Sequence, residues 1–166
     1  MNILLVSDTH GRTDALEKLL ETHQAQVDLV CHMGDYGSDL RKYENTYKNL
    51  KMAAVNGNTD FSLYGQTEQV LNFQLKNGSN VRFLITHGHK FGVKKSLDRL
   101  VSYAKELGVN AVFFGHTHVD VCFYENDLFI MNPGSLTFGN NRQSTYGLVK
   151  IQDDLKFTGV VIDYEG

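Results

Sequence analysis

Three short apolar runs near the start of the chain predict three buried β-strands. They lie at 3–6, 28–32 and 52–55, and polar or glycine residues follow each of them. The segments between them carry apolar residues every three or four positions, which predicts two amphipathic helices. The first helix is expected at 13–23, and the second along Leu40, Tyr43, Tyr47 and Leu50. The first third of the chain therefore has a predicted β-α-β-α-β order.

Alternation of apolar and polar residues takes over after residue 70. Residues 71–75 and 81–85 alternate on either side of Asn77-Gly78, a pattern typical of a β-hairpin. One further helix is expected at 97–107 and should end at Gly108. Further strands are expected at 111–114, 119–124, 128–131, 146–151 and 157–163. This order predicts an α/β fold in which two mixed sheets pack together and helices flank them.

Composition narrows the class of protein. The 166 residues suit one domain over 1–166, and the formal net charge of −3 argues against binding to a nucleic-acid backbone. No signal peptide is visible and no apolar run approaches the ~20 residues that cross a bilayer, so no membrane association is expected. Cys31 and Cys122 lie in apolar runs and are expected to be buried, reduced thiols. A cytoplasmic location is therefore expected.

Metal-ligating residue types occur at the ends of five predicted strands. In extended backbone, the side chains of Asp8 and His10 would point the same way. Each such residue has an ordinary alternative role, as a helix cap, a turn residue or a strand-edge histidine. Four of the seven histidines, however, form two His-x-His pairs that each follow an apolar strand. The candidate metal ligands are Asp8, His10, Asp35, Asn58, His87, His116 and His118.

Seven ligands are too many for one tetrahedral zinc ion and suit two metal ions that share a carboxylate. Two divalent ions with two carboxylates and a bridging hydroxide leave a net positive site, which attracts a phosphate ester. Mixed nitrogen and oxygen ligands are compatible with manganese, iron, zinc, cobalt or nickel.

Over most of its length, from Asp8 to Ser135, the chain resembles the calcineurin-like metallophosphoesterase superfamily, in the motifs Asp8-Thr9-His10, Gly34-Asp35, Gly57-Asn58, His87 and Gly115-His116-Thr117-His118 and in their order. The short length and the motif Gly57-Asn58-Thr59-Asp60 resemble the small prokaryotic branch of this superfamily, the YfcE-type phosphodiesterases. The resemblance implies a four-layer α/β/β/α sandwich and two divalent metal ions, with Mn²⁺ the expected metal. It further implies that Asp35 bridges the metals together with a hydroxide that attacks phosphorus in line. One metal would be held by Asp8, His10 and His118, and the other by Asn58, His87 and His116.

One position departs from the family pattern. Many members carry a histidine directly after the motif's asparagine, where it protonates the leaving group, and this chain has Thr59. Such a general acid is typically worth ~10²–10⁴-fold in rate. Asp60, His32 and His89 are the alternatives for this role, although a structural or supporting role is expected for His32, and a supporting or solvent-exposed loop position for His89. The candidate catalytic residues are Asp35, Asn58 and Asp60.

The expected function is metal-dependent hydrolysis of small phosphodiesters. A phosphomonoesterase or nucleotidase at the same site and a non-catalytic protein-binding scaffold of the same fold are the alternatives. The expected partner is a small phosphate ester, and a homodimer is compatible with the sequence. Substrate specificity is expected to come from the loops at 61–68 and 138–144.

Overall fold

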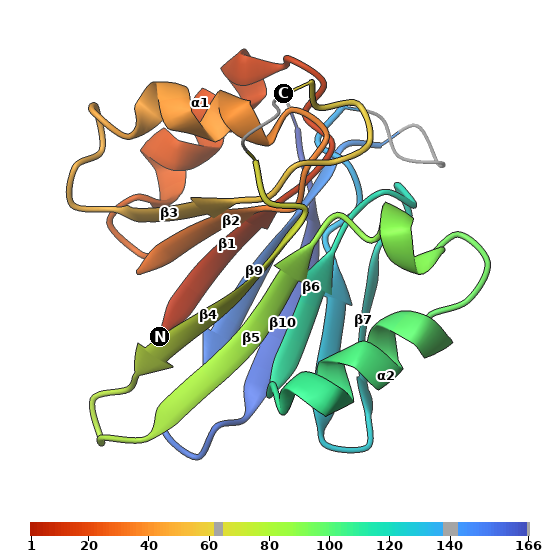
Figure 1. Cartoon of the computed structure of the whole chain (residues 1–166). Helices are drawn as coiled ribbons and strands as arrows, with labels where there is room; N and C mark the ends of the chain where they lie inside the picture. The colour runs from red at the N-terminus through yellow and green to blue at the C-terminus, as the bar shows by residue number, and fades with distance from the viewer. Residues whose placement is uncertain (62–64, 138–142, 166) are drawn as a thin grey trace.

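Two five-stranded β-sheets pack face to face, and helices cover their outer faces (Figure 1). The structure is a computed structural model that describes residues 1–61, 65–137 and 143–165. The result is the predicted four-layer α/β/β/α sandwich with two mixed sheets, so the expected fold class is confirmed.

The first sheet has the strand order β10-β9-β1-β2-β3. Its parallel strands are β1 (Asn2–Val6), β2 (Leu29–His32) and β3 (Lys51–Ala54). Its antiparallel strands are β9 (Thr145–Ile151) and β10 (Phe157–Asp163). Helix α1 (Thr13–His23) lies on the outer face, where Leu16 and Leu20 pack against Leu4 and Val30.

The second sheet has the strand order β4-β5-β6-β8-β7. Parallel pairing joins β5 (Asn80–Thr86), β6 (Ala111–Phe114) and β8 (Leu128–Asn132). The edge strands β4 (Glu68–Gln74) and β7 (Val121–Glu125) are antiparallel to their neighbours. Helix α2 (Asp98–Leu107) packs on the outer face beside the short 3₁₀-helix η2 (His89–Phe91), and Gly108 ends α2 in the left-handed conformation.

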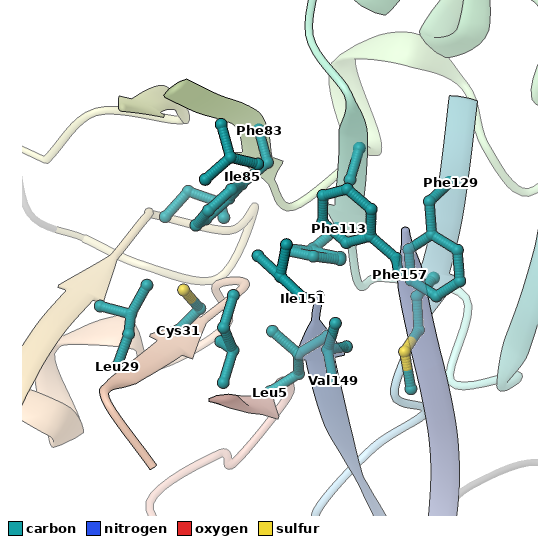
Figure 2. Close-up of a cluster of buried hydrophobic side chains, with 14 of the residues drawn as sticks. Leu5, Leu29, Cys31, Phe83, Ile85, Phe113, Phe129, Val149, Ile151 and Phe157 are labelled. Atoms are coloured by element: carbon teal, nitrogen blue, oxygen red, sulfur yellow. The ribbon is translucent and has the colours of Figure 1, made fainter. Parts of the chain in front are cut away.

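The main core lies between the two sheets (Figure 2). Leu5 and Cys31 of the first sheet face Phe83, Phe113 and Phe129 of the second, and none of these side chains is more than 2% exposed. The rings of Phe83 and Phe113 lie 5.3 Å apart. This apolar interface fixes the two sheets relative to each other, so the carboxyl ends of β1, β2, β5 and β6 meet at one edge (Figure 1).

Two expectations about local structure were wrong. The predicted second α-helix is instead a 3₁₀-helix, η1 (Gly37–Tyr43), followed by turns to residue 50. Its backbone bonds span three residues, as in the 2.9 Å bond from Asp39 N–H to Tyr36 O, and Gly37 and Ser38 are poor α-helix formers. Cys122 is a free thiol as expected, but its residue is exposed because β7 is an edge strand.

Among the described residues, no helix has both the length and the apolar character needed to cross a bilayer.

Candidate metal centre

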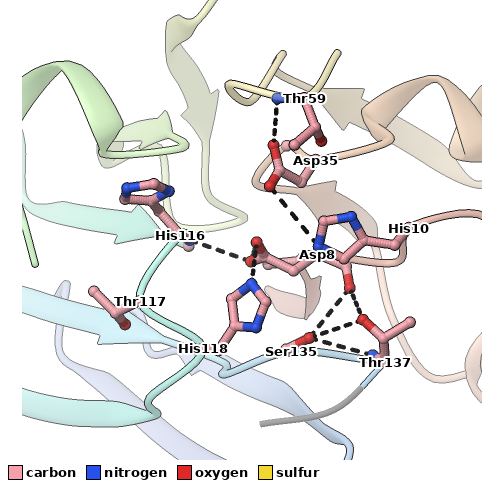
Figure 3. A network of polar contacts seen from close by, with 12 residues as sticks. Asp8, His10, Asp35, Thr59, His116, Thr117, His118, Ser135 and Thr137 are labelled. Carbon is pink, nitrogen blue, oxygen red and sulfur yellow. Dashed lines mark hydrogen bonds and ion pairs between the residues drawn. The ribbon is translucent and has the colours of Figure 1, made fainter. Parts of the chain in front are cut away.

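The candidate ligands follow the ends of strands from both sheets. Figure 3 shows Asp8, His10, Asp35, His116 and His118 of this set near one another. Asp8 and His10 follow β1, Asp35 follows β2, and Asn58 follows β3. From the second sheet, His87 follows β5, while His116 and His118 follow β6. Residues far apart in sequence therefore reach one edge of the sandwich.

One group of donor atoms comes from Asp8, His10 and His118. Their ligand atoms lie within 4.8 Å of one another, a separation that one metal ion can span. Nε2 of His118 lies 3.0 Å from Oδ1 of Asp8. Both sheets contribute to this group, because His118 belongs to the loop after β6.

A second group joins Asp8 to Asp35 and His87, again within 4.8 Å. Nδ1 of His87 lies 2.7 Å from the carbonyl oxygen of Met33 and donates its proton there. This bond leaves the Nε2 lone pair facing the site, as is usual for a metal-binding histidine. Nε2 of His87 lies 3.2 Å from Oδ1 of Asn58, so the asparagine belongs to the same group.

Asp35 belongs to the second group and also reaches toward His10 of the first. Its Oδ2 is 3.8 Å from Nε2 of His10, and its Oδ1 is 3.4 Å from Nε2 of His87. The backbone N–H of Thr59 donates to Oδ1 at 3.0 Å (Figure 3). One carboxylate thus presents an oxygen to each group.

His116 lies beside the second group on the β6 side, although its ring nitrogens are not among the ligand atoms that lie within 4.8 Å of one another. Its ring centroid lies 4.9 Å from that of His87. Burial, with the charges of His87 and Lys94, lowers the pKa of His116 to about 4. The imidazole is therefore neutral at pH 7 and can offer a nitrogen lone pair to a metal.

Asp8 gives the clearest indication that a cation fits the site. The residue is fully buried, and Oδ2 accepts hydrogen bonds from the Ser7 hydroxyl and the His116 N–H. Oδ1 is buried and makes no hydrogen bond of regular geometry within the described residues, although His118 is close. Burial opposes ionisation, but the contacts with His118, Ser7 and His87 outweigh it and lower the pKa of this carboxyl. A buried carboxylate with one unsatisfied oxygen beside imidazole nitrogens suits a divalent ion.

The ligands converge through left-handed turns. Positive φ angles occur at Asp8 (54°), His10 (44°), Asp35 (52°), His116 (69°) and His118 (56°). The expectation that Asp8 and His10 lie in extended backbone was therefore wrong. Non-glycine residues in this region are strained, and such strain gathers at functional sites.

A buried polar chain beneath the site fixes two of the ligand loops. Gly34 N–H donates to Nδ1 of His32 at 3.2 Å, so Nε2 carries the proton and donates to Oγ1 of Thr9 at 3.1 Å. Thr9 in turn donates to Asp39 at 3.0 Å, and Lys42 pairs with Asp39 at 2.9 Å. Burial lowers the pKa of His32 to about 4. The chain thus ties the loop of Asp8 and His10 to the loop of Asp35.

The loop after β8 supports the ligand loop that follows β6 and the backbone of Asp8. Asn132 Nδ2 donates to Gly115 O at 3.0 Å and to Thr117 Oγ1 at 2.9 Å. Ser135 and Thr137 donate their hydroxyl protons to the backbone oxygen of Asp8 (Figure 3). These supporting residues were not predicted, since serine, threonine and asparagine after a strand also suit an ordinary turn.

The structure favours a positioning role for Asp60 over that of a general acid. Its two oxygens accept backbone N–H bonds, from Tyr36 at 2.8 Å and from Gly57 at 2.6 Å. It thereby ties the turn that carries Asn58 to the loop of Asp35. Thr59 provides no acid, and His32 is buried in the polar chain.

His89 lies nearer to the site. Its ring is 5.4 Å from that of His87 and 6.1 Å from that of His116. Burial, with the charges of His87 and Lys90, lowers the pKa of His89. The loops expected to set specificity, 61–68 and 138–144, include positions 62–64 and 138–142, which lie outside the described residues.

Known proteins resemble this chain along almost its whole length. The family model for the calcineurin-like phosphoesterase superfamily domain matches residues 1–154. The probable metallophosphoesterase YsnB of Bacillus subtilis strain 168 is 33% identical over 156 residues, covering 93% of this chain and 86% of that protein. The phosphodiesterase YfcE of Escherichia coli strain K12 is 28% identical over 175 residues, covering 90% of this chain and 87% of that protein. Among solved structures, a predicted phosphoesterase from Streptococcus pneumoniae TIGR4 superposes with a TM-score of 0.75 at 26% identity, covering 98% of this chain and 97% of that one.

Proposed function

The chain belongs to the calcineurin-like phosphoesterase superfamily, and from this premise we propose that it hydrolyses small phosphodiesters at a site for two divalent metal ions. The position of Asp35 carries the proposal. One oxygen faces His10 in the first donor group and the other faces His87 in the second. A carboxylate in this position suits a bridge between two ions.

The residues divide into two sets around that bridge. Asp8, His10 and His118 are proposed to hold one ion. The proposed ligands of the other ion are Asn58, His87 and His116. Divalent ions bound there would supply Lewis-acid activation of a water molecule and of the phosphoryl oxygens.

The chain itself supplies fixed geometry and charge. The bond from His87 to Met33 O holds that imidazole in the tautomer with a free Nε2. Thr59 N–H, donating to Asp35, holds the bridging carboxylate in one orientation. Two carboxylates, Asp8 and Asp35, belong to the donor groups, so two bound divalent ions would leave the site positive enough to attract a phosphate diester anion.

The side chains at 58–60 set the substrate range that we propose. Thr59 cannot act as an acid at neutral pH, and both oxygens of Asp60 accept backbone bonds. No proton donor at these positions assists the leaving alcohol. Substrates with good leaving groups, such as aryl diesters, should therefore react much faster than alkyl diesters.

Manganese is the metal that we propose from the resemblance to the family, and the mixed donor set of imidazole nitrogen with carboxylate and amide oxygen is compatible with it, as it is with iron, zinc, cobalt or nickel. A cytoplasmic location is proposed on the basis of the two free cysteines, Cys31 and Cys122.

The test is hydrolysis by the purified chain, first stripped of metal with a chelator and then supplied with single divalent ions. Bis(p-nitrophenyl) phosphate and p-nitrophenyl phosphate are compared as diester and monoester. We expect activity only with metal, a preference for the diester, and a steep fall in rate as the leaving-group pKa rises.

The matched variants are Asp35→Asn, which changes the bridge, and Asp153→Asn, which makes the same substitution on an exposed turn between β9 and β10. Asp35→Asn should lose the activity and Asp153→Asn should keep it. Equal rates with and without metal, or wild-type activity in Asp35→Asn, would refute the proposal. A strong preference for the monoester would instead identify a phosphomonoesterase.

A further inference from the structure

An open groove of about 630 Å³ lies along one side of the metal centre. His116, Thr117 and His118 form its metal-facing side. The other lining residues are Val93, Lys94, Leu97, Phe114, Val119 and Val121. Its volume is within the range of small-molecule pockets, and it shares two candidate metal ligands with the site described above.

The groove has an apolar floor and an apolar rim. Phe114 and Val93 are 1% and 6% exposed and form the floor. Leu97, just before α2, and Val121, at the start of β7, are half-buried, while Val119 is 44% exposed. Half-buried Leu97 and Val121, together with exposed Val119, thus form an apolar surface beside a strongly polar centre, and such a surface suits an apolar group of a ligand.

A single cation, Lys94, stands in this lining. Its side chain is exposed, and within the described residues it forms no ion pair with a carboxylate. The ammonium lies close enough to His116 to contribute, after burial, to the lowered pKa of that histidine. The groove therefore combines an apolar surface with a positive charge near the metal ligands.

We propose that this groove binds a bulky apolar or aromatic substituent of the phosphodiester substrate, and that Lys94 attracts the phosphate anion. The inference rests on the proposed function and adds the substrate class, namely diesters of aryl or similarly bulky apolar alcohols. The groove is continuous with the metal centre, so a substituent that fills it lies against His116 and His118 while the phosphate is at the metal site.

Binding of two diesters that differ only in their substituents tests the proposal. Diphenyl phosphate and dimethyl phosphate carry the same charge. Phenoxide is a poorer leaving group than p-nitrophenolate and methoxide is poorer still, so hydrolysis during the titration should be slow, and phenol release is measured to check this. Each is titrated calorimetrically into the full chain loaded with Mn²⁺. Diphenyl phosphate should bind at least about tenfold more tightly, because the aryl rings bury apolar surface in the groove.

Conservative variants locate the effect. Val121→Thr and Val119→Thr replace one methyl group by a hydroxyl at nearly constant size, so each should weaken the binding of diphenyl phosphate by about threefold and leave that of dimethyl phosphate unchanged. The matched control is Val160→Thr, the same change at an exposed valine of β10 that does not line the groove. Lys94→Gln should weaken both esters alike by a few-fold, and this loss should vanish at high salt.

Equal affinities for the two diesters, or equal effects of Val121→Thr on both, would overturn the proposal, as would failure of diphenyl phosphate to bind at millimolar concentration. Failure of the proposed function gives a different result. In that case diphenyl phosphate would still bind in a Val121-dependent manner, while no phosphate ester would be hydrolysed with any metal.

Discussion

The interface between the sheets and the edge that carries the metal ligands obey different physical rules. At the interface, side chains such as Phe83 and Phe113 are buried, apolar and in regular strands. At the edge, Asp8 and His87 are equally buried but polar, and Asp8 lies in left-handed backbone. The interface stabilises the fold, whereas the edge carries strain and buried charge that the rest of the fold must offset.

This contrast explains why the site has so many supporting residues. The interface needs only close packing, which many apolar side chains provide. The edge needs specific hydrogen-bond partners, including His32 and Asn132, because each buried polar atom must form a hydrogen bond. Substitutions in the two regions should therefore affect different properties of the protein.

The largest expected effect is that of Asp8→Asn, which should abolish activity while leaving the stability of the metal-free protein nearly unchanged. In Asp8→Asn, the amide oxygen can keep the bonds from Ser7 and the His116 N–H, and its NH₂ can donate to Nε2 of His118. Metal-dependent hydrolysis should fall by at least ~10³-fold, equivalent to about 4 kcal/mol. The free energy of unfolding in chelator should stay within about 1 kcal/mol of wild type or rise.

Hydrolysis assays and urea denaturation in chelator check this pair of expectations. A severe loss of stability in metal-free Asp8→Asn would show that Asp8 stabilises the fold as the interface residues do. That result would contradict the distinction between the interface and the edge.

The reciprocal change is Phe113→Ala at the centre of the interface. Phe113 is fully buried, and its ring lies 5.3 Å from Phe83 and 6.4 Å from Phe129. Its loss should lower the free energy of unfolding by ~3–5 kcal/mol, through lost burial and an internal cavity. Urea denaturation measures this, and molecules that remain folded should keep wild-type metal affinity. A change below about 1 kcal/mol would contradict the assigned core.

The buried histidine His32 should make the stability of the protein depend on pH. Burial holds the pKa of His32 at about 4 in the folded protein, below the ordinary value of 6.5 for an exposed histidine. The unfolded chain therefore binds a proton between pH 6.5 and 4 that the folded chain does not. Stability should be fully present above pH 6.5 and fall by ~3 kcal/mol towards pH 4.

Denaturation of wild type and His32→Gln across this window isolates the contribution. The variant has an amide in place of the imidazole, and this amide does not titrate. Its free energy of unfolding should therefore change less between pH 6.5 and 4. Identical pH dependence in the two proteins would rule out this role for His32.

The smallest effect concerns backbone strain. His10 has a φ of 44°, where glycine is unstrained and alanine is not. Both His10→Gly and His10→Ala remove the imidazole, but the glycine variant should be more stable by about 1 kcal/mol in chelator. The matched pair is Glu17→Gly and Glu17→Ala at an exposed position of α1, where the order should reverse by a similar amount. The same order at both positions would argue against strain at His10.

The sequence patterns predicted most of the fold, because strand burial and helix periodicity are local properties. Gly108 marked the end of α2, and Asn77-Gly78 marked the hairpin between β4 and β5. The 3₁₀-helix at 37–43 was missed because apolar spacing of three and four residues does not distinguish it from an α-helix.

The candidate site, like the fold, could be predicted from the sequence only in part. The candidate ligands could be named from their positions after apolar runs and from the family pattern. Their left-handed backbone could not be predicted, because a positive φ at His116 or His118 depends on how both sheets meet. The supporting contacts of His32 and Asn132 join loops far apart in sequence and become visible only in three dimensions.

The central claim is that two donor groups sharing one edge hold two metal ions per chain. The most direct measurement is an anomalous-difference map from crystals of the full chain soaked in Mn²⁺. Two peaks should appear ~3.5–4 Å apart, one beside His10 and His118 and the other beside His87 and His116, with Asp35 between them. A single peak, or peaks away from Asp35, would contradict the account.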